Sequence, residues 1–199
     1  MNDSFSRANL SRLKQDRKFS ANLCGFSLNF TTTWGLFSPR EIDEGSKLLL
    51  EYVTVQDGQK VLDLGCGYGA LGVPLGRQTP SGRVTMVDKD FVAVDYAQRN
   101  AVANHVNNAR VMLSNGLQQL DSETFDLVVT NLPAKSGKEL YYIMFNDVFE
   151  SLSPGGCFYI VTITGLRRFV QRAFGEIFGN YEKLKQGKTY TVAVACKAP

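Results

Sequence analysis

The 199-residue sequence has a single histidine, few cysteines and no long hydrophobic run. No apolar stretch approaches the roughly 20 residues of a membrane-spanning helix, so we expect no membrane partner. His105 lies at the polar end of an expected helix, which excludes Ser-His-Asp, Cys-His and multi-histidine metal sites. We therefore expect neither a bound metal nor catalysis that depends on histidine.

The four cysteines are widely scattered and include no C-x-x-C pair; they are Cys24, Cys66, Cys157 and Cys196. This spacing indicates neither a zinc site nor a disulfide framework. Cys66 is expected to be a small buried thiol rather than a nucleophile. We therefore expect a cytoplasmic protein whose thiols are reduced.

The net charge of +3 is concentrated at the beginning of the chain. Residues 1–20 hold five basic and two acidic side chains, whereas the remaining 179 residues hold 17 of each. A basic arm on a neutral body suits the phosphate backbone of a nucleic acid. A solvated terminus explains the same charges equally well. We divide the chain into a basic N-terminal arm, 1–20, and one domain, 21–199.

Apolar and polar residues alternate over 20–37, which predicts a β-hairpin. Ser38-Pro39-Arg40-Glu41 then predicts a helix start, with serine as the cap and proline in the first turn. Beyond Gly58, strands and helices alternate, which predicts an α/β fold with a mainly parallel sheet covered on both faces. The predicted strands are 60–64, 83–88, 109–113, 125–130 and 156–163, the predicted helices are 70–78, 90–105, 139–151 and 166–178, and two further runs, 181–185 and 189–197, predict a C-terminal hairpin.

A glycine-rich turn, Asp63-Leu64-Gly65-Cys66-Gly67-Tyr68-Gly69, follows the first of these strands. Glycines let the backbone turn sharply and let a ligand come close. A carboxylate at this turn repels a pyrophosphate and favours a ligand with a cationic centre, such as S-adenosylmethionine. The glycines also fit G-x-G-x-x-G, with Asp88 located 21 residues after Gly67, so an NAD-dependent oxidoreductase is the alternative.

The full D-x-G-x-G-x-G pattern, with a second strand that ends at Asp88, resembles the class I S-adenosylmethionine-dependent methyltransferases. This resemblance implies a doubly wound, Rossmann-like, mainly parallel seven-stranded sheet with a C-terminal antiparallel hairpin, here extended by the N-terminal hairpin. It implies S-adenosylmethionine as the cofactor, with Asp88 on the ribose hydroxyls and Asn115 at the adenine edge. The expected cofactor-binding residues are Asp63, Gly65, Gly67, Gly69, Asp88, Asn115, Gly116 and Asn131.

Asn131-Leu132-Pro133-Ala134 resembles the N-P-P-F/Y motif of methyltransferases that act on exocyclic or amide nitrogens. In such a motif the asparagine oxygen and the next carbonyl each accept one N–H of the amine and aim its lone pair at the methyl group. Asn131, Leu132 and Pro133 are therefore the expected catalytic residues. Leu132 replaces the first proline of the motif, and Ala134 replaces the aromatic residue that stacks on a target base.

Residues 28–38 and 42–50 resemble the segment before the cofactor motif in the small-subunit rRNA guanine-N2 methyltransferases, which belong to the methyltransferase small domain group. The resemblance implies an RNA partner, rRNA first, and places Phe37, Ser38 and Asp43 at the mouth of the cofactor and substrate site. Trp34, Phe37 or Tyr68 is a candidate for the missing ring, with ordinary core packing as the alternative.

Other functions fit the same features. Methylation of a protein amide or a small amine is favoured by the missing aromatic residue and by the neutral body. A non-catalytic cofactor-binding module is a further alternative, although such a module has no need of the Asn131 motif. The first expectation is transfer of a methyl group from S-adenosylmethionine to an exocyclic amine of an RNA base, with guanine N2 as the first target.

Overall fold

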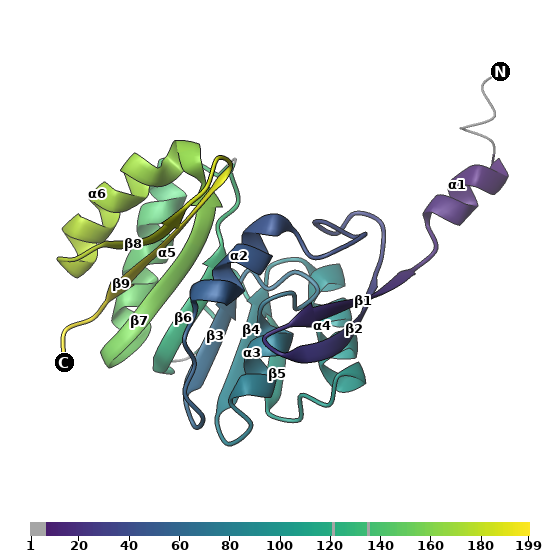
Figure 1. Cartoon of the computed structure of the whole chain (residues 1–199), viewed down its shortest axis with the longest axis horizontal. Coiled ribbons are helices and arrows are strands. Elements are labelled where there is room, and N and C mark those ends of the chain that lie inside the picture. Colours follow the sequence, from purple (N-terminus) through teal and green to yellow (C-terminus); the bar gives the residue numbers. More distant parts are fainter. Residues whose placement is uncertain (1–6, 121, 135) are drawn as a thin grey trace.

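The computed structural model describes residues 7–120, 122–134 and 136–199; residues 1–6 of the predicted arm lie outside this description. Its centre is a seven-stranded sheet in the order β5-β4-β3-β6-β7-β9-β8 (Figure 1). The five strands from β5 to β7 are parallel, and β9 pairs antiparallel with both β7 and β8. The sheet strands are β3 (Lys60–Leu64), β4 (Arg83–Asp88), β5 (Ala109–Leu113), β6 (Phe125–Asn131), β7 (Leu152–Ile163), β8 (Glu182–Gln186) and β9 (Tyr190–Cys196).

Helices cover both faces of this sheet. On one face lie α2 (Glu44–Tyr52), α3 (Gly72–Gln78) and α4 (Phe91–Ala103), together with the hairpin of β1 (Arg17–Leu23) and β2 (Phe26–Thr32). On the other face lie α5 (Lys138–Ser151) and α6 (Arg167–Phe178), and a 3-10 turn, η2 (Thr164–Leu166), leads into α6. The short α1 (Arg7–Leu13) precedes the hairpin. The predicted doubly wound fold is confirmed.

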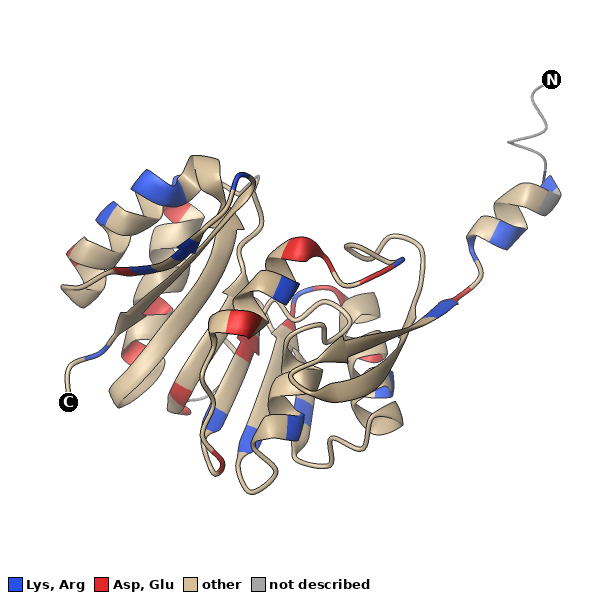
Figure 2. Ribbon diagram, viewed as in Figure 1, with Lys and Arg blue, Asp and Glu red and all other residues tan. Residues whose placement is uncertain are grey.

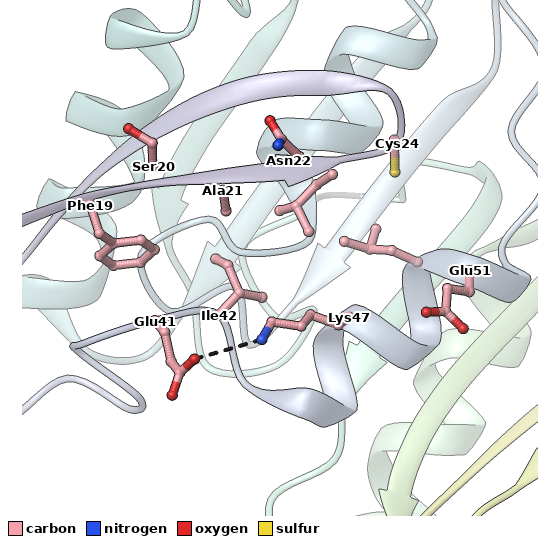
Figure 3. Close-up of a pocket in the computed structure, with 11 residues that line it drawn as sticks. Phe19, Ser20, Ala21, Asn22, Cys24, Glu41, Ile42, Lys47 and Glu51 are labelled. Carbon is pink, nitrogen blue, oxygen red and sulfur yellow. Dashed lines mark ion pairs between the residues drawn. The ribbon is translucent and has the colours of Figure 1, made fainter.

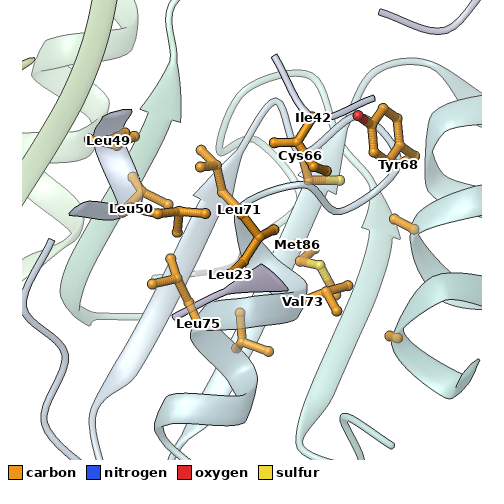
Figure 4. Close-up of a cluster of buried hydrophobic side chains, with 14 of the residues drawn as sticks. Leu23, Ile42, Leu49, Leu50, Cys66, Tyr68, Leu71, Val73, Leu75 and Met86 are labelled. Atoms are coloured by element: carbon orange, nitrogen blue, oxygen red, sulfur yellow. The ribbon is translucent and has the colours of Figure 1, made fainter. Parts of the chain in front are cut away.

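Each parallel strand supplies both hydrophobic clusters, because successive side chains point to opposite faces. In β3, Val61 packs in the cluster under α2, α3 and α4, whereas Leu62 packs in the cluster under α5 and α6. Figure 4 shows part of the first cluster, where Met86 of β4 lies near Val73 of α3. The central strands β3, β4 and β6 are buried on both faces, which is why they appear in the sequence as continuous apolar runs.

Two asparagines, Asn100 in α4 and Asn104 at the C-cap of that helix, attach the N-terminal hairpin to the domain. Asn100 accepts a hydrogen bond from the Thr31 N–H at 2.8 Å and donates to the Thr31 carbonyl at 3.0 Å. Asn104, one turn later, makes the same pair of bonds with Asn29, at 2.8 and 2.7 Å. Asn100 also donates to the carbonyl of Tyr68 in the glycine-rich turn at 2.9 Å. These side chains bond alternate residues of β2 as a neighbouring strand would.

The helix predicted to start at Ser38 starts later. α2 begins at Glu44, and Asp43 is its N-cap, accepting a hydrogen bond from the Ser46 N–H at 3.1 Å. Ser38 has a φ of 44° and donates to the Glu41 carbonyl at 2.7 Å. The prediction was wrong because the tertiary structure holds residues 38–41 in a turn, in which the Tyr68 hydroxyl lies 3.2 Å from both the Ser38 and Glu41 carbonyls.

A disulfide joins Cys157 of β7 to Cys196 of β9, so the expectation of four reduced thiols was wrong. The two cysteines are 39 residues apart in sequence and become partners only because β7 and β9 pair in this register. Disulfides are uncommon in cytosolic proteins. The expectation of a cytoplasmic location therefore loses the support that it drew from the cysteines.

Candidate functional site

The polar residues predicted to form a site lie at the carboxyl ends of neighbouring parallel strands. Asp63 is the penultimate residue of β3, Asp88 ends β4 and Asn131 ends β6. β3 lies between β4 and β6, and the order of the sheet reverses next to it. In open α/β sheets, ligands bind in the crevice at such a reversal. Three of the predicted site residues are thus brought to one edge of the sheet.

The glycine-rich turn borders open space above β3. Gly65, Gly67 and Gly69 have φ values of 73°, 55° and 91°, which L-residues with a side chain rarely adopt. A Cβ at Gly65 or Gly67 would meet no atom within 4 Å, whereas a Cβ at Gly69 would come within 2.9 Å of Val73. The first two glycines therefore form the wall of a cradle, and the third allows close packing under α3.

Asp63 is buried beneath this turn, with 1% of its surface exposed. One of its carboxylate oxygens accepts a hydrogen bond from the Gly72 N–H at 2.7 Å. The other, Oδ1, has no hydrogen-bond partner among the described residues. Burial, with a smaller contribution from the charge of Asp88, raises the pKa of Asp63 to about 7. A buried oxygen without a partner is favourably placed for a cationic ligand.

Asp88 is held by the backbone on both sides. Its Oδ2 accepts from the Gly67 N–H at 2.9 Å, and its Oδ1 accepts from the Asp90 N–H at 3.0 Å. The carboxylate is half-buried. Carboxylate oxygens have several lone pairs each, so these two bonds leave acceptor capacity for hydroxyl groups.

Asn115 and Gly116 follow β5, the strand next to β4. Asn115 is exposed, and its side chain donates to Gln118 at 3.2 Å. Gly116 has a φ of 60° and open space where a Cβ would be, and its carbonyl accepts a hydrogen bond from Ser114. This turn lies at the carboxyl end of β5, next to Asp88 of β4 and then Asp63 of β3, at the same edge of the sheet.

The side chain of Asn131 is held by two residues at the beginning of α2. Its amide nitrogen donates to Asp43 Oδ1 at 2.9 Å and to Ser46 Oγ at 3.0 Å. A carboxylate can only accept hydrogen bonds, so Asp43 requires the nitrogen of the Asn131 amide to face α2. The Asn131 carbonyl oxygen therefore faces away from α2. Ser46, which the sequence analysis did not single out, is buried.

The residues after Asn131 are anchored from both sides. The Leu132 N–H donates to the Val161 carbonyl at 2.9 Å, and the Leu132 side chain is buried. The Pro133 carbonyl accepts a hydrogen bond from the hydroxyl of Tyr141, a buried residue of α5. Ala134 is exposed and offers no ring. These contacts hold the Asn131-Leu132-Pro133 backbone in one conformation.

The loop of residues 33–43 runs from the end of β2 to the cap of α2. Trp34 and Phe37 are 60% and 67% exposed, so neither ring is part of the core. Tyr68 is 3% exposed, and burial raises the pKa of its hydroxyl, which the Ser38 and Glu41 carbonyls engage. Tyr68 therefore anchors this loop on the glycine-rich turn. Trp34 and Phe37 are the two exposed aromatic rings of the loop.

A groove of about 550 Å³ lies between β1 and α2 together with the residues just before that helix (Figure 3). Its lining includes Phe19, Cys24 and Ile42, and an ion pair of 3.7 Å joins Lys47 to Glu41 on the α2 side. None of the residues predicted to bind the cofactor lines this groove. It lies beside the strand-end site rather than within it.

Within the described part of the chain, no group of three or more His, Cys, Asp or Glu side chains is arranged to hold a metal ion. In the same residues, no helix is long and apolar enough to cross a membrane.

Comparison with known protein families matches residues 27–194 to the methyltransferase small domain. The chain belongs to this family. The match begins in β2 and ends in β9, so it includes every strand end of the site. The family confirms the expectation of an S-adenosylmethionine-dependent methyltransferase domain.

Several relatives are similar over most of this methyltransferase small domain chain. Ribosomal RNA small subunit methyltransferase C of Hamiltonella defensa is 34% identical over 165 residues, which are 79% of this chain and 47% of the relative. Ribosomal RNA large subunit methyltransferase G of Psychromonas ingrahamii is 30% identical over 81% of this chain and 44% of the relative. The uncharacterized protein YbxB of Bacillus subtilis is 33% identical over 72% of each chain.

The solved structure of one relative contains a bound cofactor. The T. thermophilus 16S rRNA N2 G1207 methyltransferase RsmC, in complex with AdoMet and guanosine, is 33% identical, with a TM-score of 0.83. The match covers 92% of this chain and 50% of that chain, so the present chain spans about half the length of the rRNA methyltransferases that it resembles. The expected cofactor, S-adenosylmethionine, is the one that this relative contains.

Proposed function

We propose that this chain transfers a methyl group from S-adenosylmethionine to an exocyclic amine of an RNA base, with guanine N2 of ribosomal RNA as the first target. The observation that carries the proposal is the fixed orientation of the Asn131 amide beside the cradle at the ends of β3 and β4. It is supported by the relative whose structure contains both AdoMet and guanosine.

The strand-end residues fit the charges and hydroxyls of S-adenosylmethionine. Asp63 offers a buried carboxylate oxygen without a partner, which suits the cationic methionyl part. The open space at Gly65 and Gly67 admits a ligand against the backbone. Asp88 has acceptor capacity for the two ribose hydroxyls, and Asn115 with Gly116 borders the place that an adenine would take. When bound, S-adenosylmethionine would supply a methyl group carried on a positively charged sulfur, and the rest of the cofactor would be the leaving group, a neutral thioether.

Asn131 and the Leu132 carbonyl orient the amine in this proposal. The lone pair of an aryl amine is delocalised into its ring, which makes the nitrogen a poor nucleophile. The Asn131 oxygen and the Leu132 carbonyl each accept one amine N–H, so the nitrogen becomes more tetrahedral and its lone pair points at the methyl group. Holding the reacting atoms in line supplies much of the rate enhancement. The nitrogen gains the methyl group and then releases a proton to water, so no dedicated base is needed.

Asp43 and Ser46 act as positioning residues, because they hold the Asn131 amide rather than the substrate. If the amide turned over, its NH₂ group would face the amine and two donors would oppose each other. The charge of Asp43 makes that orientation unfavourable, since the Asn131 oxygen would then face a carboxylate.

A protein amide or a small amine is the second candidate acceptor. The exposed Ala134, at the position of the usual aromatic residue, favours it, as does the equal number of acidic and basic residues in 21–199. The same Asn131 chemistry serves an amide nitrogen.

The deciding experiment incubates the protein with radiolabelled S-adenosylmethionine and unmodified ribosomal RNA or ribosomal subunits, and then identifies labelled nucleosides after digestion. Labelled N2-methylguanosine is the expected product. Asn131→Ala should remove most of the label while calorimetry shows S-adenosylmethionine affinity near that of the wild type. Wild-type protein that binds the cofactor but leaves RNA unlabelled would overturn the RNA proposal and favour a protein or small-molecule acceptor.

A further inference from the structure

A basic segment lies beside the loop that leads to the site. Residues 7–18 contain five basic side chains, namely Arg7, Arg12, Lys14, Arg17 and Lys18, and one acidic side chain, Asp16. Figure 2 shows basic residues along α1 and at the beginning of β1. Four of the five are exposed, and Arg17 is partly exposed. The segment therefore presents its positive charge to solvent.

Asp16, the single acid of this segment, is already engaged. Its carboxylate accepts a hydrogen bond from the Tyr96 hydroxyl and lies 3.9 Å from the guanidinium of Arg99. Both partners are on α4, so Asp16 fixes the segment to the domain just before β1 starts. Arg99 is itself paired with Asp95 at 2.6 Å. With Asp16 included, the five basic side chains still leave the segment a net charge of +4.

The basic segment meets the 33–43 loop at Trp34. The ammonium group of Lys14 lies 5.8 Å from the centroid of the Trp34 ring. Trp34 is 60% exposed, so its ring is not explained by core packing. A cation and a large flat ring are thus presented together, which is the combination that single-stranded nucleic acids bind through phosphates and stacked bases.

The 33–43 loop connects this surface to the candidate catalytic residue. From Trp34 the chain passes Phe37, is anchored on Tyr68 through the Ser38 carbonyl, and reaches Asp43, which holds Asn131. The rings of Trp34 and Phe37 are exposed along this loop, and the positive charge of the basic segment lies at its Trp34 end. Within the loop, Arg40 is offset by Glu41 and Asp43. Ala134, three residues after Asn131, is exposed and offers no ring.

We propose that Trp34 and the basic segment 7–18 form an RNA-binding surface for the single-stranded nucleotides that flank the methylated base. Trp34 stacks on a flanking base, and Lys14 with its neighbours contacts phosphates. This inference rests on the proposed function. Trp34, which lies outside the Asn131-Leu132-Pro133-Ala134 motif, provides the base stacking that Ala134 cannot.

Trp34 is the only tryptophan of the chain, so its fluorescence reports on this surface directly. The experiment titrates the full chain, with S-adenosylmethionine present, with single-stranded oligonucleotides that contain an unmodified guanosine, and records tryptophan fluorescence and RNA affinity at several salt concentrations. We expect quenching on binding. Trp34→Ala should weaken RNA binding about 5- to 150-fold, and Trp34→Phe, which keeps a ring, should recover much of that loss.

The charged half of the surface is tested with paired double variants. Lys14→Gln with Lys18→Gln should weaken binding and lower the slope of log affinity against log salt by about 1.4, since each phosphate contact contributes about 0.7 for single strands. Lys60→Gln with Arg83→Gln is the matched control, because these side chains are also exposed but lie at the amino ends of β3 and β4, the edge of the sheet opposite the site. The control should bind RNA as the wild type does.

Methyl transfer to the same RNA is measured in parallel. If the wild type methylates RNA but the Trp34 and Lys14 variants bind it unchanged, this surface is wrong and the proposed function stands. If the wild type binds RNA with the expected losses in the variants but transfers no methyl group, the surface stands and the proposed function fails. Wild-type protein with no measurable affinity for RNA overturns both.

Discussion

Asn131 carries an amide whose two ends have opposite hydrogen-bonding character, and Asp43 with Ser46 determines which end faces the site. The same Asp43 oxygen accepts from the Ser46 N–H as the cap of α2. One carboxylate thus joins the stability of a helix end to the orientation of a side chain at the end of β6. Variants can separate these two roles.

We expect Asp43→Ser to lower turnover about 10- to 100-fold, because serine still caps α2 but is too short to reach the Asn131 amide. Asp43→Asn keeps an acceptor oxygen at the same distance and should recover most of the turnover. Steady-state kinetics would measure kcat, with thermal unfolding and S-adenosylmethionine affinity as controls. A kcat for Asp43→Ser equal to that of the wild type would refute the positioning role.

We expect Asp63 to make cofactor binding depend on pH. Burial raises its pKa to about 7, well above the value near 3.9 of an unfolded aspartate. The folded protein therefore holds this proton more tightly, and the stabilisation, present below about pH 4, is lost as the pH rises to about 7. A cationic ligand favours the ionised form, so S-adenosylmethionine should bind more tightly as the pH rises toward about 7.

Below that pKa, affinity should fall by up to about tenfold per pH unit. Asp63→Asn keeps an acceptor for the Gly72 N–H and should make the affinity weaker but nearly independent of pH. Calorimetric titration between about pH 5 and 7, below the pKa of about 7.7–8.0 of an α-amino group such as that of the cofactor, measures both. The same slope in wild type and Asp63→Asn would show that another group titrates.

At the scale of elements, α4 stabilises the N-terminal hairpin in the way that a third strand would. Asn100 bonds Thr31 and also the Tyr68 carbonyl, so it joins β2 to the glycine-rich turn. Asn104 repeats the pattern at Asn29. The outer edge of β2 is thereby covered by side chains, which protects it from pairing with another chain.

Asn100→Ala should lower the free energy of unfolding by about 2–3 kcal/mol, because it leaves backbone groups of Thr31 and Tyr68 unpaired in a partly buried place. Urea denaturation measures this change. Asn107→Ala, at an exposed position just after α4, is the control and should change stability by no more than about 0.5 kcal/mol. An equal effect of the two substitutions would contradict the strand-like role of Asn100.

At the scale of the whole molecule, the Cys157–Cys196 disulfide joins a parallel strand of the sheet to its antiparallel end. Cys24 and Cys66 are free. Thiol titration of the unfolded, unreduced protein should therefore find two reactive thiols, and four after reduction. Four before reduction would show that the bond does not form under the conditions of purification.

Replacement of Cys157 and Cys196 by serine should lower the free energy of unfolding by up to about 4 kcal/mol, the loop-closure value for a separation of 39 residues. Urea denaturation with and without a reductant measures the loss. Cofactor affinity should stay near that of the wild type, since Cys157 lies in the first half of β7, away from the strand ends that form the site. A Cys24→Ser variant controls for loss of a free thiol.

From Lys60 onward, the sequence alone determined the order of strands and helices, because the apolar runs and the helical spacing are local patterns that packing on both sheet faces requires. It also determined the strand-end positions of Asp63, Asp88 and Asn131, since parallel strands carry their carboxyl ends to one edge. The N-terminal hairpin and the C-terminal antiparallel pair follow from the same alternation of apolar and polar residues.

Only the tertiary structure decided which distant residues meet. Asp43 and Asn131 are 88 residues apart, and Asn100 is 69 residues from Thr31. The helix start predicted at Ser38 failed because Tyr68, 30 residues away, holds that turn. Such contacts depend on how the chain packs in three dimensions, and a cap residue or a cysteine looks the same in the sequence whichever partner it finally contacts.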